Sequence, residues 1–288
     1  MEILLVSKTV LFILAIIVFL SLLQFFVSIH PPSYSDPSTP NNYGLTYENV
    51  EFTTSDNIKI RAWLIKSDKA NGTVIVGHGY PFNKGNILPL ATFLYPDYNL
   101  LYYDHRYFGE SEGRVTTVGM KEVEDVKAAV SFIHKRFGSK EPIALFGFSL
   151  SAAAMLMSKE KVNAIISDSA YANLEQMTKD MYRIFGPLKY PFVKITDLLS
   201  IIFFGKHPKA VSPAESIKEV KTPIFVIHGD KDHQISVKNA YLLKESRPNI
   251  EFWIVENSDH GQAHAIVKEE YEKRVKNFLK KNMAVMPK

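Results

Sequence analysis

The chain of 288 residues contains no cysteine, which excludes disulfides, zinc–thiolate sites, iron–sulfur clusters and cysteine nucleophiles. It also lacks a basic cluster. The net charge is +4 and the lysines and arginines are scattered, which argues against nucleic acid as a partner. Internal repeats and low-complexity tracts are missing too. Apolar residues make up 46% and charged residues 22%, which is the balance of a globular chain rather than a disordered one.

One segment has no charged residue at all. Residues 9–29 are mainly Leu, Ile, Val and Phe, and as a helix they would span about 30 Å, enough to cross a bilayer. The alternatives are a buried core helix, which is seldom apolar on every side over such a length, and a cleaved signal peptide. The run exceeds the ~7–15 apolar residues of a signal peptide, and no small-x-small pattern follows Ile29. We therefore predict that residues 1–30 form an uncleaved, single-pass transmembrane anchor.

Charges on the two sides of this segment predict its orientation. Lys8 and the amino group of Met1 precede the span, although Glu2 opposes them. The first charged residue after the span is Asp36. The positive-inside rule then places the N-terminus in the cytoplasm and the rest of the chain on the extracytoplasmic side.

The remainder of the chain divides into a linker and one folded domain. Residues 31–46 are rich in Pro, Ser and Asn and are predicted to be an extended linker that lifts the domain off the membrane. In residues 47–283, strand and helix patterns alternate after an initial hairpin, which predicts an α/β fold with a mostly parallel sheet covered by helices on both faces. The predicted strands are 48–53, 58–65, 74–76, 100–103, 143–148, 162–167, 224–228 and 250–255, and the predicted helices are 88–95, 123–137, 151–157, 237–246 and 269–281. Gly138 is predicted to end its helix as a left-handed cap.

A segment at about 171–207 interrupts this alternation. It carries many large apolar residues without a strand pattern and is too long for an ordinary loop, so we predict a helical insertion. It follows the predicted strand 162–167, and loops at the carboxyl ends of parallel strands face the ligand crevice. We therefore expect a cap that covers the substrate, the alternative being apolar side chains that only pack on one another.

The pentapeptide Gly147–Ser151 lies where a predicted strand meets a predicted helix. A serine at this point is forced to the tip of a sharp turn at a helix N-terminus, where its hydroxyl is exposed and negative charge is favoured. We therefore predict that Ser149 is a nucleophile. The usual pattern is G-x-S-x-G, and Ser151 stands in place of its last glycine. The alternative is that Ser149 is an ordinary helix N-cap.

A serine nucleophile needs a base, and the base needs an orienting carboxylate. In strand-turn-helix hydrolases the three follow the order serine, acid, histidine. Asp230 and Asp232 both follow the strand 224–228, and His260 follows the strand 250–255, so they are the candidate acids and base. Other residues with plausible structural roles are His228, His233, His264 on the first turn of the last helix, and Asp259 as a possible cap of that helix.

Acyl transfer also needs backbone N–H groups aimed at the developing oxyanion. One predicted donor is the N–H of Leu150, directly after the nucleophile. The second is the N–H of Tyr80, in the loop after the first parallel strand, where Gly77 and Gly79 permit unusual backbone angles.

These motifs resemble those of α/β-hydrolases, in particular the membrane-tethered Bem46/ABHD13-like group and its serine-peptidase-like relatives. The matching pieces are His78-Gly79, Asp104–Ser111, Gly147–Ser151, His228–Asp232 and Asp259–Gly261. The resemblance implies an α/β-hydrolase fold with a helical cap, Asp232 rather than Asp230 as the acid, and a structural role for Asp104–Ser111. It also implies hydrolysis of an ester or related acyl bond. Relatives that are dehalogenases or epoxide hydrolases use an aspartate nucleophile, and Ser149 speaks against those reactions.

We therefore predict a carboxylesterase- or lipase-like serine hydrolase with Ser149, Asp232 and His260 as its triad, acting through an acyl-enzyme without metal or cofactor. The expected partners are a small-molecule or lipid-like acyl substrate and, through the N-terminal helix, a membrane. A peptidase or thioesterase would use the same triad. The alternative from another class is a non-catalytic, membrane-tethered binding protein.

Overall fold

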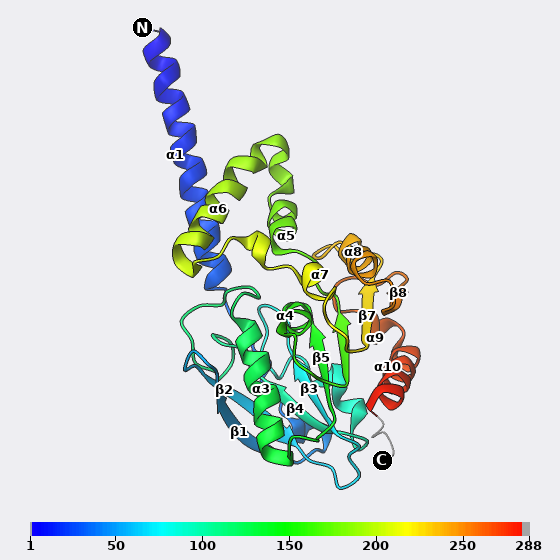
Figure 1. The fold of residues 1–288 in the computed structure, drawn as a ribbon. Helices are drawn as coiled ribbons and strands as arrows, with labels where there is room; N and C mark the ends of the chain where they lie inside the picture. The colour runs from blue at the N-terminus through cyan, green and yellow to red at the C-terminus, as the bar shows by residue number, and fades with distance from the viewer. Residues whose placement is uncertain (1, 284–288) are drawn as a thin grey trace. The chain divides into compact units, whose positions relative to one another are not determined.

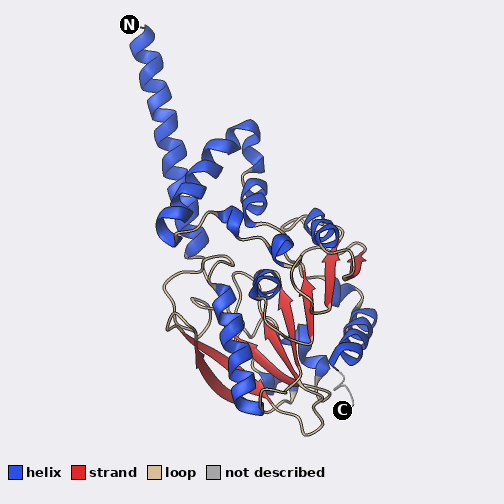
Figure 2. Ribbon diagram, in the orientation of Figure 1, coloured by secondary structure: helices blue, strands red, loops and turns tan. Residues whose placement is uncertain are grey.

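The computed structural model describes residues 2–283. Met1 and residues 284–288 lie outside the described residues, so the amino group of Met1, one of the charges that predict the orientation, is outside them too. The chain forms two compact units. The helical unit comprises the N-terminal segment up to Pro32 together with Asn173–Val211, and the sheet unit comprises Ser33–Ala172 together with the chain from Ser212 onward. All the strands that Figure 2 draws in red belong to the sheet unit.

The sheet unit is built on an eight-stranded sheet with the order β1-β2-β4-β3-β5-β6-β7-β8 (Figure 1). Strand β2 pairs antiparallel with β1 and β4, and the other neighbours pair in parallel. The strands are β1 (Glu48–Thr53), β2 (Lys59–Ile65), β3 (Thr73–Gly77), β4 (Asn99–Tyr103), β5 (Ile143–Phe148), β6 (Ala164–Asp168), β7 (Ile224–Gly229) and β8 (Glu251–Val255). The predicted α/β fold, with a hairpin added at one edge of a mostly parallel sheet, is confirmed.

Helices cover both faces of this sheet. One face packs on α3 (Glu122–Phe137), α4 (Leu150–Ser158) and α8 (Lys238–Ser246), and the other packs on α2 (Leu88–Ala91) and α10 (Lys268–Met283). Because successive side chains of a strand point to opposite faces, Ile75 joins the first core while Val74 and Val76 join the second. The inner strands β3, β4, β5, β6 and β7 are buried at every residue, which is why these segments are mostly apolar in the sequence.

The remaining helices are short or belong to the helical unit. In the sheet unit these are η1 (Pro40–Tyr43), η2 (Thr92–Leu94), α7 (Pro213–Ser216) and α9 (Ala263–Ile266); in the helical unit they are α1 (Glu2–Ile29), α5 (Leu174–Met181), η3 (Arg183–Leu188), α6 (Lys189–Phe204) and η4 (Pro208–Ala210). The segment predicted as a helical insertion, at about 171–207, forms α5, η3 and α6, and η4 follows it. In α1, Leu11–Ile29 is long and apolar enough to cross a membrane, with a mean hydropathy of 2.8.

Two local predictions need comment. The segment predicted as a helix over 88–95 is helical from Leu88 to Leu94 but is divided into α2 and η2, and the predicted left-handed cap at Gly138 is wrong. Gly138 does end α3, donating its N–H to the carbonyl of His134, but its φ of 104° and ψ of 156° lie outside the left-handed helical region. The chain leaves α3 in an extended direction toward β5, so a left-handed turn is not needed there.

Part of the segment predicted as a linker lies on the sheet unit. The N–H of Tyr34 donates to the carbonyl of Pro81 over 3.1 Å. The N–H of Asp36 donates to the side chain of Asn83, whose amide donates back to the carbonyl of Asp36, both over 3.2 Å. Residues 33–36 are therefore hydrogen-bonded to the loop that follows β3.

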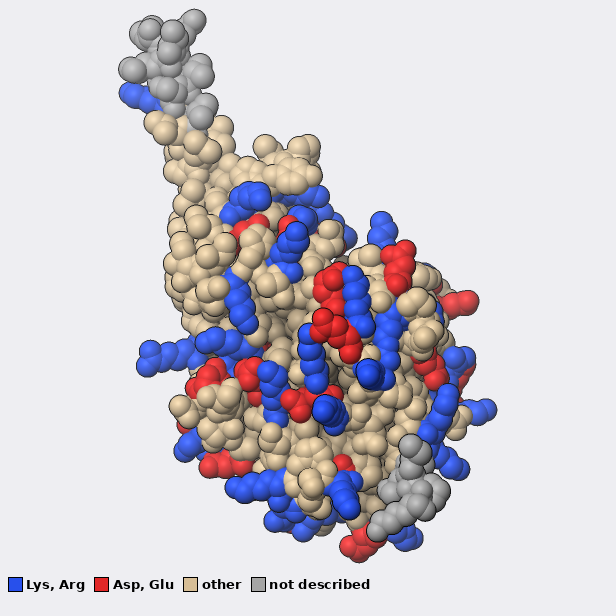
Figure 3. Space-filling view, viewed as in Figure 1, with Lys and Arg blue, Asp and Glu red and all other residues tan. Residues whose placement is uncertain are grey.

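On the face of the sheet unit drawn in Figure 3, basic and acidic side chains are interspersed.

Candidate active site

Ser149 lies at the tip of the turn between β5 and α4, with a φ of 51° and a ψ of −107°. A positive φ is rare for a residue with a side chain and stores backbone strain. The N–H of Ser149 is held by the carbonyl of Asp168 at the end of β6, over 2.8 Å. The Ser149 hydroxyl makes no capping hydrogen bond to α4, so the alternative of an ordinary helix N-cap is wrong.

The hydroxyl of Ser149 instead faces an imidazole. Nε2 of His260, in the loop after β8, lies 3.0 Å from Oγ of Ser149, and Nδ1 lies 2.7 Å from Oδ2 of Asp232, in the loop after β7. The side chain of Asp232 is fully buried, and its Oδ1 accepts the N–H groups of Gln234 and Ile235 over 3.0 and 2.7 Å. The three side chains that the sequence selects therefore meet at the carboxyl edge of the sheet.

The charge of Asp232 fixes the proton on its neighbour. Burial acts to raise the pKa of Asp232, but hydrogen bonds from His228 and His260 outweigh it and hold this pKa below its ordinary value. The ionised carboxylate only accepts, so Nδ1 of His260 carries a proton. Nε2 is then left to accept the proton of the Ser149 hydroxyl, which is the arrangement that activates a serine.

The rival acids and the neighbouring histidine do not contact the ring of His260. Asp230 is exposed to solvent. Asp259 accepts the backbone N–H groups of His233 and His260 over 2.9 and 2.7 Å, so its predicted role as a cap of the last helix is wrong. His233 is exposed and pairs with Asp259 over 3.2 Å. Asp259 therefore shapes the loop that carries His260.

The other histidines have structural partners. Nε2 of His228, a fully buried ring, donates to the carbonyl of Ile235 over 2.7 Å and lies 3.3 Å from Asp232, so it supports the loop of the acid. His264 was expected on the first turn of the last helix, and this is wrong. It lies in the separate short helix α9, where its Nε2 is 3.2 Å from Glu272.

The loop after β3 passes directly beside the nucleophile turn. A Cβ atom on Gly79 would lie 2.8 Å from the ring of Phe148 and 3.1 Å from Cβ of Ser149. Neither Gly77 nor Gly79 has a positive φ, so glycine is required here for close approach rather than for the unusual backbone angles that we predicted. Tyr80 follows this contact, and Leu150 is the first residue of α4.

His78 anchors the same loop. Burial, followed by the neighbouring His105, lowers the pKa of His78 to about 4, so its ring is neutral at pH 7. The ring Nε2 accepts the backbone N–H of His105 over 3.0 Å, which leaves the proton on Nδ1. Nδ1 donates to the carbonyl of Gly79 over 2.7 Å. The neutral ring thus ties the loop of Gly79 to the loop after β4.

The Asp104–Ser111 segment is structural, as the resemblance implies. The buried carboxylate of Asp104 accepts the N–H of Lys84 over 2.7 Å, its ammonium over 2.6 Å and the N–H of Glu110 over 2.9 Å. The side chain of Lys84 is only 2% exposed, and it also pairs with Glu110. This buried pair holds the loops after β3 and β4 together.

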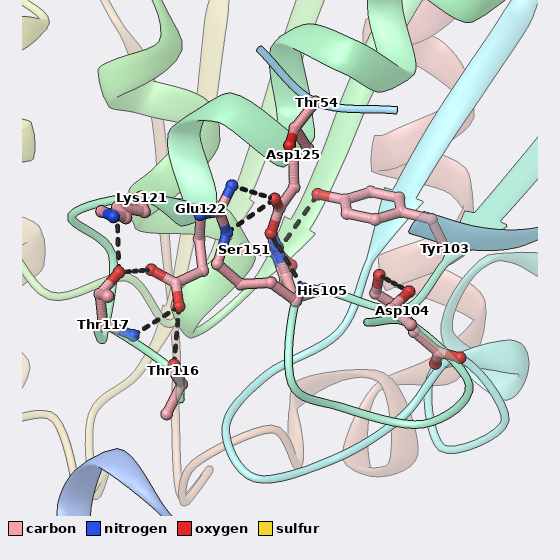
Figure 4. A network of polar contacts seen from close by, with 12 residues as sticks. Thr54, Tyr103, Asp104, His105, Thr116, Thr117, Lys121, Glu122, Asp125 and Ser151 are labelled. Atoms are coloured by element: carbon pink, nitrogen blue, oxygen red, sulfur yellow. Dashed lines mark hydrogen bonds and ion pairs between the residues drawn. The ribbon is translucent and has the colours of Figure 1, made fainter. Parts of the chain in front are cut away.

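Ser151 has a role that the sequence analysis missed. Its buried hydroxyl donates to the carbonyl of His78 over 2.6 Å and lies 2.7 Å from Nε2 of His105. Nδ1 of His105 lies 3.0 Å from Asp125 in α3, and Figure 4 shows this ring between Ser151 and Asp125. The only signal in the sequence was the serine at the glycine position, because its partners are distant along the chain.

A pocket of about 320 Å³ opens beside His260, at the lower end of the ~300–1,000 Å³ range of small-molecule sites. Apolar side chains of Phe82, Ile87, Leu90 and Phe148 line it. It can receive an uncharged, largely hydrocarbon group next to the base.

Comparison with known proteins identifies the family. Residues 115–285 match the model of the prolyl oligopeptidase family. The chain belongs to this family. An uncharacterized membrane protein of Saccharomyces cerevisiae, YNL320W, is 24% identical over 84% of this chain and 82% of its own length. Protein bem46 of Schizosaccharomyces pombe is 22% identical over 71% of this chain and 67% of its own length.

Among solved structures, the esterase Pf2001 of Pyrococcus furiosus is 28% identical, with a TM-score of 0.73 over 89% of this chain and 98% of its own. The prolyl oligopeptidase family member described here therefore has the α/β-hydrolase fold, and its predicted resemblance to Bem46-like proteins is confirmed. Family and fold together support a serine hydrolase.

Proposed function

We propose that this chain hydrolyses carboxylic esters through an acyl-enzyme formed on Ser149, with His260 as the base and Asp232 as the orienting acid. The observation that carries the proposal is the position of the His260 ring. It lies 3.0 Å from the Ser149 hydroxyl on one side and 2.7 Å from the Asp232 carboxylate on the other. Esterase activity of a structural relative is consistent with this reaction.

In the acylation step, Oγ of Ser149 attacks the carbonyl carbon while Nε2 of His260 takes the hydroxyl proton. The C–O bond to the alcohol then breaks, and His260 returns the proton to the departing alkoxide. Water, deprotonated by the same nitrogen, next attacks the acyl carbon; the bond to Oγ of Ser149 breaks, His260 returns the proton to Oγ, and the acid is released. Asp232 remains ionised and stabilises the imidazolium. No step uses a metal or a cofactor.

The oxyanion is proposed to bind the N–H groups of Tyr80 and Leu150. Support comes from the contact between Gly79 and the nucleophile turn, since a Cβ on Gly79 would lie 3.1 Å from Cβ of Ser149. Leu150 also begins α4, whose N-terminus favours negative charge. Removal of one such donor typically lowers turnover by about 10²–10³.

The proposed substrate is a small-molecule or lipid-like ester. The apolar pocket of about 320 Å³ beside His260 favours an alkyl or acyl group over a charged one. Residues 171–207 are proposed to form the cap over this substrate. A peptide substrate is the second candidate, favoured by membership of the prolyl oligopeptidase family. A thioester is a further candidate, because the same triad would hydrolyse it.

The chain is further proposed to be anchored in a membrane by α1. Support comes from the apolar stretch Leu11–Ile29 and from a relative described as a membrane protein. Lys8 before the stretch and Asp36 after it favour an extracytoplasmic sheet unit. Protease added to intact cells tests this orientation. The sheet unit should be cleaved from outside, and full protection of the sheet unit would indicate the opposite orientation.

The test of the nucleophile is a fluorophosphonate probe on the full chain in detergent. Wild type and the control Ser246→Ala, in α8, are expected to be labelled, and Ser149→Ala is not. Equal labelling of Ser149→Ala would remove Ser149 from the mechanism. A folded wild type that the probe does not label, and that cleaves no substrate, would favour the non-catalytic binding protein. Rates on matched ester, thioester and amide substrates then separate the three hydrolase activities.

A further inference from the structure

The surroundings of Ser151 provide both space and hydrogen-bond partners for its side chain. Its side chain is fully buried two residues after the proposed nucleophile. A Cβ atom on Gly77 would lie 2.4 Å from Oγ of Ser151, so the glycine in β3 makes room for this hydroxyl. The space that a glycine at 151 would leave is thus occupied by a polar group that contacts His78, His105 and Tyr103.

The hydroxyl of Ser151 bonds to the loop after β3 and lies beside the loop after β4. Its one O–H donates to the carbonyl of His78 over 2.6 Å. Its oxygen lies 2.7 Å from Nε2 of His105, and the hydroxyl of Tyr103 lies 3.3 Å from the same nitrogen.

The other nitrogen of His105 lies against an acid. Nδ1 is 3.0 Å from Oδ2 of Asp125, whose other oxygen accepts the Nε–H of Arg106 over 2.9 Å. Arg106 pairs further with Asp56 over 2.7 Å. The ring of His105 is therefore held by Ser151 at one nitrogen and by Asp125 at the other.

This polar group connects two loops and two helices around the proposed site. His105 follows β4, Asp125 lies in α3, Ser151 lies in α4 and His78 follows β3. The hydrogen bond from Ser151 to the carbonyl of His78 joins the nucleophile turn to the loop of Tyr80. His105, held in turn by Asp125, fixes the position of the Ser151 oxygen.

We propose that Ser151, held by His105 and Asp125, is a positioning residue that sets the distance between the nucleophile turn and the backbone loop of the oxyanion hole. The inference rests on the proposed function, because it assigns a purpose to the geometry of that site. None of the three side chains touches the substrate. Their effect is transmitted through the carbonyl of His78 to Tyr80, two residues later.

The kinetic test compares Ser151→Ala with wild type on a chromogenic ester, using the full chain in detergent. Misplacement of one oxyanion donor should lower kcat about 10- to 100-fold and leave KM nearly unchanged, because the oxyanion exists only in the transition state. Ser151→Cys, a similar shape with a weak S–H donor, should recover part of kcat. The matched control is Ser158→Ala, which removes another buried hydroxyl of α4, one that donates to the carbonyl of Met155 over 2.8 Å, and should keep wild-type kcat.

A spectroscopic test is independent of turnover. With ¹⁵N-labelled histidine, and with His105 assigned by its loss in His105→Gln, the Nε2 resonance of His105 should shift in Ser151→Ala, because the hydroxyl 2.7 Å from that nitrogen is removed. It should stay in place in Ser158→Ala. An unshifted His105 resonance in Ser151→Ala, or a Ser151→Ala enzyme with wild-type kcat, would overturn the inference while leaving the proposed hydrolysis intact. Activity that survives Ser149→Ala would overturn the proposed function, and the positioning role with it.

Discussion

Nδ1 of His260 lies 2.7 Å from Oδ2 of Asp232, whereas Asp230, only two residues earlier, points to solvent. The turn after β7 therefore carries two carboxylates, and the fold directs one of them to the imidazole. Burial and two further backbone hydrogen bonds hold Asp232 in place. The contrast between these neighbours makes them a matched pair for mutagenesis.

Asp232→Asn is expected to lower kcat on a chromogenic ester by about 10³–10⁴, because an amide in this position favours the wrong imidazole tautomer. Asp230→Asn should retain nearly full kcat, since its side chain is exposed. Steady-state rates of both variants, after circular dichroism has shown that each is folded, check the prediction. A large loss in Asp230→Asn with an active Asp232→Asn would reverse the assignment of the acid.

Gly79→Ala should impair catalysis without abolishing the nucleophile. The added Cβ would lie 2.8 Å from the ring of Phe148 and 3.1 Å from Cβ of Ser149, so the loop must move away from the turn. We expect kcat to fall by about 10²–10³, the cost of one oxyanion donor. Labelling by a fluorophosphonate should become slower but still reach completion. An unchanged rate would show that the backbone of this loop does not contribute to the reaction.

Lys84→Met should destabilise the sheet unit strongly. It leaves the carboxylate of Asp104, which is 0% exposed, without its ammonium partner 2.6 Å away. Loss of one member of a buried pair typically costs about 3–5 kcal/mol. The double variant Lys84→Met/Asp104→Asn removes the uncompensated charge and should recover part of the loss. Thermal unfolding followed by tryptophan fluorescence measures both, and additive effects would mean that the two groups are not coupled.

Acidification should destabilise the protein through His78. Burial lowers the pKa of this ring to about 4 in the folded chain, against about 6.5 in an unfolded chain. Between these values the unfolded state binds a proton that the folded state does not, so stability rises with pH across this window and falls as pH drops. At about 1.4 kcal/mol per pH unit, the loss from pH 6.5 to pH 4 is about 3 kcal/mol for this fully buried group.

The comparison is the Tm of wild type and His78→Gln at pH 7 and pH 5. Glutamine cannot titrate, so the variant should start from a lower Tm and lose less of it on acidification. A wild-type Tm that falls no more than that of the variant would contradict the role of His78.

Local patterns along the chain were sufficient for the order of the strands and helices, because a strand buried on both faces is apolar throughout and a covering helix is apolar on one side. They were also sufficient to select Ser149 and His260. Ser149 directly follows β5 and His260 lies in the loop after β8, and the carboxyl ends of these strands lie at the same edge of the sheet. The apolar stretch of α1 was equally visible, since hydropathy needs no knowledge of contacts.

Contacts between distant segments were not accessible in this way. The choice between Asp230 and Asp232 depends on which carboxylate the turn buries, so residue type and spacing left it open. The hydroxyl of Ser151 has its partners in two other loops, at His78 and His105, and its neighbours in sequence carry no sign of them. Hydrogen bonds and ion pairs of this kind act over about 3 Å, and only folding brings such groups within that range.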